Sequence, residues 1–252
     1  MNLEENLNEI SKMIATTKEL LDANPDDAML LYMLEQDKAL YTSTITSAYS
    51  KLLPNITSAS ELLQEVYQDN LKSAVDPFYI AQYFNIEVKK EPFLQNGIGR
   101  CDFFEDSITI TYKPTNRLRD RFTVAHELGH IFLHFSKGIS LHFEDYESVD
   151  SELVVANNND YTPLLSAARF SKTSEYDMFE READNFAGEL LVPRVVLDKM
   201  LHRLPKGKSI KASLLQSFFN VSKPVIQIAL KKYGLLNSGQ VINDINIHNR
   251  GW

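Results

Sequence analysis

Apolar residues in the first 70 positions recur with the spacing of α-helices. In the first predicted helix they fall at four-then-three intervals, at Leu3, Leu7, Ile10, Ile14 and Leu21. Asn24 is expected to cap a second helix, with Pro25 in its first turn and Leu53 at its end. Ser58 and Glu61 have capping-box spacing and predict the start of a third. This part of the chain is therefore expected to form a helical hairpin and one further helix.

The pattern becomes mixed after residue 75. Asp76–Phe84 predicts a short helix, and a strand is expected to begin at Ile86–Val88. Ser107–Tyr112 alternates apolar and polar residues, which is the period of a half-buried strand. Gly97 and Gly99 are expected to form the turn before it. A small β-sheet should follow the N-terminal helices.

Two apolar helices are predicted downstream, over about 116–135 and 178–191. The polar stretch 136–176 between them lacks a clear period, so we expect an insertion or a functional lid. Near the C-terminus, Ala212–Phe219 and Lys223–Tyr233 have the spacing of a helix-turn-helix. We therefore expect a mostly helical α+β fold.

Composition and charge narrow the possible classes of protein. The only cysteine, Cys101, excludes an internal disulfide and favours the reducing cytoplasm. No stretch approaches the roughly 18 apolar residues of a membrane span, and the acidic N-terminus differs from a signal peptide. The net charge is −8, yet residues 194–252 carry 10 basic and 2 acidic side chains. That basic end permits an acidic partner such as nucleic acid, although a solvated lysine-rich surface is the simpler interpretation.

The sequence His126-Glu127-Leu128-Gly129-His130 has the HExxH pattern. Residues four apart share one face of a helix, so both imidazoles can bind one metal ion. Glu127 follows the first histidine and can accept a proton from water without being a ligand. Two surface histidines would be the alternative, but the flanking residues are largely apolar, as in a buried active-site helix.

A tetrahedral zinc site needs a third protein ligand. His134 lies one turn beyond His130, too far along a straight helix to join the same ion, and is expected to pack or to act from outside the ligand set. On the downstream helix, Glu180 and Asp184 share one face. Glu180 is the predicted ligand, and Asp184 is predicted to orient a ligand histidine. Glu182, on another face, is the second choice for the ligand.

The segments RFTVAHELGH and EREADNFAGELLVP resemble the ImmA/IrrE family of zinc metallopeptidases. The resemblance covers about residues 71–235. It implies that His126, His130 and Glu180 bind zinc and that Glu127 is the catalytic glutamate. Mn²⁺ is an alternative ion, because two imidazoles and a carboxylate accept either metal. The resemblance also implies a protein substrate, namely a transcriptional repressor of the helix-turn-helix type.

Two features depart from the family pattern: the long gap between His130 and Glu180, and the N-terminal helices, which match nothing in the family. We expect a helical N-terminal extension, a zincin-like metallopeptidase domain, a helix-turn-helix-like segment and a tail, at 1–70, 71–200, 201–236 and 237–252.

The expected activity is that of a cytoplasmic zinc endopeptidase. An intact Glu127 favours it over a non-catalytic regulator that binds DNA or a partner through residues 200–236, and over a toxin–antitoxin component that acts by complex formation. Tyr161 and Tyr176 are candidate oxyanion donors, and strand Ile108–Tyr112 is expected to offer its edge to an extended substrate. We expect weak or no nucleic-acid binding and no membrane binding, and the sequence leaves the oligomeric state open.

Overall fold

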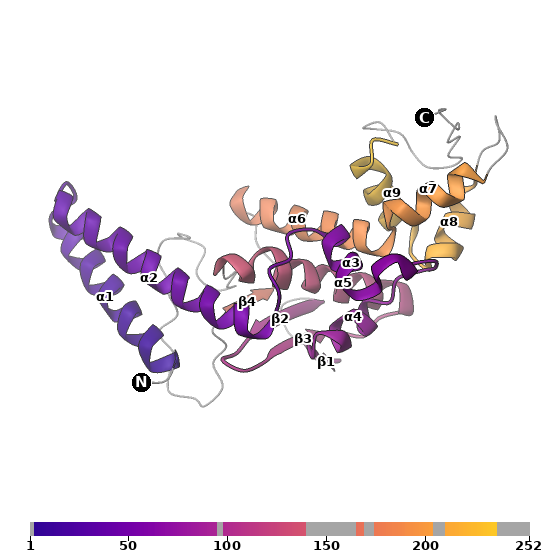
Figure 1. Cartoon of the computed structure of the whole chain (residues 1–252). Coiled ribbons are helices and arrows are strands. Elements are labelled where there is room, and N and C mark those ends of the chain that lie inside the picture. Colours follow the sequence, from indigo (N-terminus) through magenta and orange to yellow (C-terminus); the bar gives the residue numbers. More distant parts are fainter. Residues whose placement is uncertain (1–2, 95–97, 140–164, 169–173, 204–209, 236–252) are drawn as a thin grey trace.

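The computed structural model describes residues 3–94, 98–139, 165–168, 174–203 and 210–235. Figure 1 shows the arrangement of these parts. Their helices, in chain order, are α1 (Leu3–Ala23), α2 (Ala28–Leu52), α3 (Ala59–Tyr67), η1 (Gln68–Asn70), α4 (Pro77–Tyr83), α5 (Arg117–Leu133), η2 (Phe135–Lys137), α6 (Ser174–Leu191), α7 (Arg194–His202), α8 (Ala212–Phe219) and α9 (Lys223–Lys232). Their strands are β1 (Glu87–Lys90), β2 (Gly99–Phe103), β3 (Ile108–Tyr112) and β4 (Leu165–Ala168).

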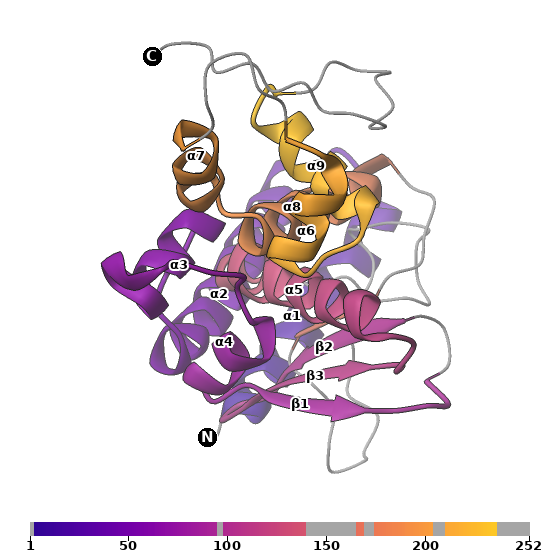
Figure 2. The same cartoon turned by 90° about the vertical axis from the view of Figure 1, so that its right-hand side faces the viewer.

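These elements are stacked in layers. The sheet lies at one side, α5 covers it, α6 lies across α5, and α8 and α9 lie beyond α6 (Figure 2). The strand order is β1-β3-β2-β4, with β1 parallel to β3 and the other two pairs antiparallel. The fold is α+β and mostly helical, as the hydrophobic pattern predicted.

The pattern of apolar and polar residues did not predict strand β2. Gly99, expected in a turn, is the first residue of this strand and pairs with Tyr112. Residues 100–103 alternate polar and apolar side chains over only four positions, and burial does not follow this alternation, because Asp102 is buried together with Cys101 and Phe103. The expectation for strand β3 was also wrong. It lies inside the sheet between β1 and β2, so its backbone cannot accept an added substrate strand.

Helix boundaries follow local capping. Asp27 caps α2 by accepting hydrogen bonds from two backbone N–H groups, so this helix begins at Ala28 and not at Pro25. Asn116 caps α5 in the same way through the N–H of Arg119. In the described part of the chain, no helix is both long and apolar enough to cross a bilayer.

The hairpin of α1 and α2 projects from the other elements, but its base belongs to the main core (Figure 1). The Tyr49 ring meets Phe103 of β2 edge-on, with ring centroids 6.1 Å apart. Helix α2 also contacts η2, directly after α5. Gly138 ends η2 with φ of 71°, where a side chain would lie 3.2 Å from Thr42 Cγ2. The hairpin is thus attached next to the end of the HExxH helix.

Candidate metal centre

Helix α5 holds the HExxH residues inside the protein. His126, Glu127 and His130 are each only 1% exposed. Close packing of α6 is possible because a Cβ on Gly129 would lie 3.0 Å from the Cα of Ala183. The glycine of this motif therefore lets the second helix approach the two histidines.

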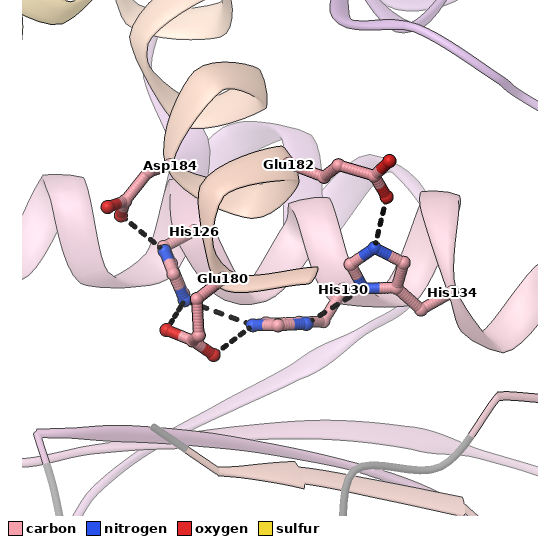
Figure 3. A network of polar contacts seen from close by, with 6 residues as sticks. All are labelled: His126, His130, His134, Glu180, Glu182 and Asp184. Carbon is pink, nitrogen blue, oxygen red and sulfur yellow. Dashed lines mark hydrogen bonds and ion pairs between the residues drawn. The ribbon is translucent and has the colours of Figure 1, made fainter. Parts of the chain in front are cut away.

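Glu180 of α6 lies between the two histidines (Figure 3). Its carboxylate oxygens are 3.2 Å from His126 Nε2 and 3.1 Å from His130 Nε2. The two Nε2 atoms are 3.0 Å apart. One donor atom from each of the three residues lies within 4.8 Å of the others, and no further residue joins this group in the part of the chain that the structure describes.

The outer ring nitrogens of the two histidines have different partners. His126 Nδ1 is 2.9 Å from the Asp184 carboxylate, as the spacing of acids on α6 predicted. His130 Nδ1 is 2.9 Å from His134 Nδ1, and the far nitrogen of His134 is 3.1 Å from Glu182 Oε2. Figure 3 shows both arrangements.

The carboxylates set the protonation of the histidines. Burial lowers the pKa of His126, but hydrogen bonds to Asp184 and Glu180 outweigh it and raise the pKa to about 9. Burial dominates at His130 and lowers its pKa to about 4. Glu180 loses hydration, yet its hydrogen bonds to both histidines hold its pKa well below its usual range. The group therefore combines one imidazolium, one neutral imidazole and one carboxylate at neutral pH.

Glu127 projects toward β2. A Cβ on Gly99 would lie 2.3 Å from Glu127 Oε1 and 2.6 Å from Thr123 Cγ2, so only glycine fits beside this carboxylate. Burial and the nearby Glu127 charge raise the pKa of the Cys101 thiol, which keeps it protonated. The charge of Glu127 helps to raise the pKa of His126, so this carboxylate lies near the three metal-binding candidates, and it is not one of them.

The donor set fits a divalent transition metal. Two imidazoles and one carboxylate are the ligands of many catalytic zinc sites, which keep a fourth position for water or substrate. The three donor atoms also converge at short distances in a buried site. Burying such polar and charged groups costs free energy, and a bound cation would offset that cost.

The structure brings together all five residues that the sequence selected around the motif, namely His126, Glu127, His130, Glu180 and Asp184. Tyr161 and most of the expected 136–176 insertion lie outside the described residues, as does the tail after 236. Tyr176 lies in the first turn of α6. His134 is outside the ligand group, as its position one turn further along predicted. The pairing of His134 with Glu182 was not foreseen, and its signal was the four-residue spacing that continues beyond HExxH.

The buried side chain of Arg121, in α5 before the motif, links this helix to two distant segments of the chain. Its guanidinium donates hydrogen bonds to the backbone oxygens of Val75 and of Asn220, the residue that ends α8. These contacts join the start of α5 to the segments before α4 and after α8. They help to fix the helix that carries the site.

The comparison with protein families supports a peptidase. The family described as the IrrE N-terminal-like domain, Peptidase_M78, matches residues 81–231. This match includes α5, α6 and all the residues of the candidate centre. Among curated proteins, none matches the chain significantly.

Proposed function

We propose, from the premise that the chain belongs to the IrrE N-terminal-like family of M78 peptidases, that it is a zinc-dependent endopeptidase of the cytoplasm. Its substrate would be a specific regulatory protein, such as a helix-turn-helix repressor. The observation that carries the proposal is the position of Glu127, buried beside three convergent metal donors.

In this proposal His126, His130 and Glu180 hold the ion. Bound Zn²⁺ supplies Lewis acidity, which lowers the pKa of water from about 15.7 to about 7 and polarises a carbonyl group. Glu127 accepts the proton of the attacking water and then delivers it to the leaving amine. Asp184 accepts the hydrogen bond from His126 Nδ1–H, so that Nε2 keeps its lone pair for the metal.

Cleavage of a single protein substrate would agree with the family and with the position of the site between the sheet and α6. The sheet covers α5 on one side and α6 covers it on the other, so large parts of the centre are enclosed. Glu180 has only 13% of its side chain exposed. We therefore expect slight activity on an unfolded general substrate such as casein.

The test compares wild type with Glu127→Gln. The variant keeps side-chain size and should keep the metal, but it lacks the carboxylate base, so cleavage should fall about a hundredfold or more. Each form is expressed together with the product of the neighbouring gene, and new N-termini are mapped by mass spectrometry. The wild type should generate one new terminus, while the variant should bind the same protein without cutting it. If both forms have the same cellular effects, proteolysis is not the function.

A regulator that binds DNA through residues 200–236 is the other candidate, because this end of the chain is basic. The second helix of the expected motif, α9, buries Val225, Ile226 and Ala229 and packs on α6. Its Ile228 contacts the α6 backbone at Gly188. A recognition helix would need a free face with polar side chains for bases. We expect only weak DNA binding that falls steeply with salt, and a sequence-selective footprint would favour the regulator.

A further inference from the structure

The Nδ1 atoms of the two proposed ligand histidines, His126 and His130, contact different kinds of side chain. His126 meets a carboxylate directly, since its Nδ1 is 2.9 Å from Asp184. His130 meets a second imidazole, that of His134, and only through this ring does it reach the carboxylate of Glu182. The three-residue chain from His130 to Glu182 spans α5 and α6, as Figure 3 shows.

The position of each ring nitrogen fixes the direction of the hydrogen bonds. His130 Nε2 faces Glu180 and His126, so it is the atom that would bind the metal. A metal on Nε2 leaves the proton on Nδ1 of the neutral ring. His130 Nδ1–H must then donate to His134 Nδ1, whose own proton is on Nε2 and is donated to Glu182. With a cation bound to His130 Nε2 and the Glu180 carboxylate, this one pair of tautomers satisfies the contacts of His130 with His134 and of His134 with Glu182.

We propose that His134 and Glu182 are positioning residues that select the His130 tautomer able to bind the metal. The inference rests on the proposed function, since it assigns His130 as a ligand. Next to Glu182, His134 must carry its proton on Nε2, because the carboxylate can only accept a hydrogen bond. The carboxylate thus defines which nitrogen of His134 is protonated, and His134 defines which nitrogen of His130 is protonated.

The surroundings of His134 support this role. Its ring is 0% exposed, so water does not compete for either nitrogen. Phe179 packs edge-on against it, with ring centroids 4.9 Å apart, which limits rotation of the imidazole. A buried imidazole without partners would be costly, and here both ring nitrogens have one. The Glu182 side chain is 44% exposed, so the His134–Glu182 contact lies at the edge of the buried cluster.

The contacts of His134 and Glu182 should contribute measurably to metal affinity. Partners outside the ligand set typically contribute tenfold to a hundredfold to the affinity of a metal site. His134→Phe preserves a buried ring but removes the acceptor, so zinc affinity should fall by about that factor. Glu182→Gln keeps an oxygen acceptor and should cost less than about tenfold. His134→Gln offers a carbonyl to His130 and an amide N–H to Glu182, and should restore most of the affinity.

The experiment measures zinc affinity of the full chain by competition with a chromophoric chelator, without any substrate. Side-chain ¹⁵N spectra of His130 provide the second readout, since they distinguish protonated, unprotonated and metal-bound nitrogens. Glu189→Gln is the matched control, because it removes a carboxylate from the same helix near Lys232, away from the centre. Circular dichroism and the unfolding midpoint establish that each variant is folded.

The proposal expects a loss of affinity with His134→Phe, a mixture of His130 tautomers in that variant, and recovery of both with His134→Gln. Wild-type affinity and a single His130 tautomer in folded His134→Phe would overturn it and would leave the proposed function intact. Equal losses in the phenylalanine and glutamine variants would also overturn it, since packing alone would then explain the effect. If wild type itself fails to bind zinc, the proposed function fails first.

Discussion

A single methyl group at position 99 should displace Glu127, the proposed catalytic base, while leaving the three proposed metal ligands in place. In Gly99→Ala the new Cβ would lie 2.3 Å from Glu127 Oε1, whereas ordinary contact begins at 3.4 Å. The carboxylate, the strand or both must therefore move apart by 1.1 Å. Thr123 Cγ2, at 2.6 Å, blocks one direction of escape.

That displacement sets the expected magnitude. A reacting group misplaced by about 1 Å can lose about a hundredfold in rate, equivalent to about 2.7 kcal/mol in the activation barrier. Zinc affinity should stay within about threefold of wild type, because neither His126, His130 nor Glu180 is among the atoms that the methyl group meets.

The assay is the rate of cleavage of the protein identified by mapping new N-termini, measured at saturating zinc. Gly188→Ala is the matched control. Its methyl group would lie 2.7 Å from Ile228 Cγ2 of α9, about two helical turns beyond Glu180 along α6, so it tests for a general packing effect. A Gly99→Ala enzyme that is folded, holds zinc and cuts at nearly the wild-type rate would refute the argument that β2 fixes Glu127.

Three further predictions concern the metal and the fold. The double variant His126→Ala/His130→Ala should no longer hold one zinc ion per chain, as measured by mass spectrometry, and zinc retained there would contradict the site. Glu180→Ala should lose most of its zinc affinity, and Asp184→Ala should lose about ten- to a hundredfold. Because the pKa of His126 is about 9 and that of His130 about 4, zinc displaces about one proton between pH 5 and 8. Affinity should therefore rise about tenfold per pH unit in that window, which calorimetry in two buffers can test, and a flat profile would contradict it. Gly138→Val must adopt φ of 71°, so the free energy of unfolding should fall by about 1–2 kcal/mol in urea titrations, and an unchanged midpoint would contradict the strain.

Helices were predictable because their signals are local. The apolar spacing of α8 and of α9 is complete within about ten residues, and the structure places both helices within one residue of the predicted bounds. Strand β2 has only a four-residue alternation as a local signal, and its position depends on pairing with β3 and β4 on its two edges. Strand β4 lies in a polar stretch and depends on pairing with β2, more than 60 positions earlier. Pairing between distant segments cannot be derived from hydrophobic period alone.

In the candidate centre, too, contacts within one helix were predictable, whereas contacts between helices were not. Spacing within one helix identified His126 and His130, and the periodicity of the next helix selected Glu180. Periodicity placed Glu182 on another face of the helix, as the second choice for the ligand, and did not reveal its contact with His134. A helical wheel gives the direction of a Cβ atom, but a glutamate carboxylate extends well beyond it and can reach a neighbouring helix. Its contact with His134 depends on how α5 and α6 cross, which the sequence does not state.

The crossing of α5 and α6 also explains how a long connection is compatible with a fixed arrangement of His126, His130 and Glu180. Gly129 against Ala183 sets the separation of the helices, while Gly138 and strand β4 anchor the chain on either side of the connecting segment. The length of that segment is therefore independent of the distance between His130 and Glu180. Doubling it would raise the entropic cost of loop closure by only about 0.6 kcal/mol. Insertions and deletions in that part of the sequence therefore cost little free energy, and they leave the separation of His130 and Glu180 to the packing of α5 on α6.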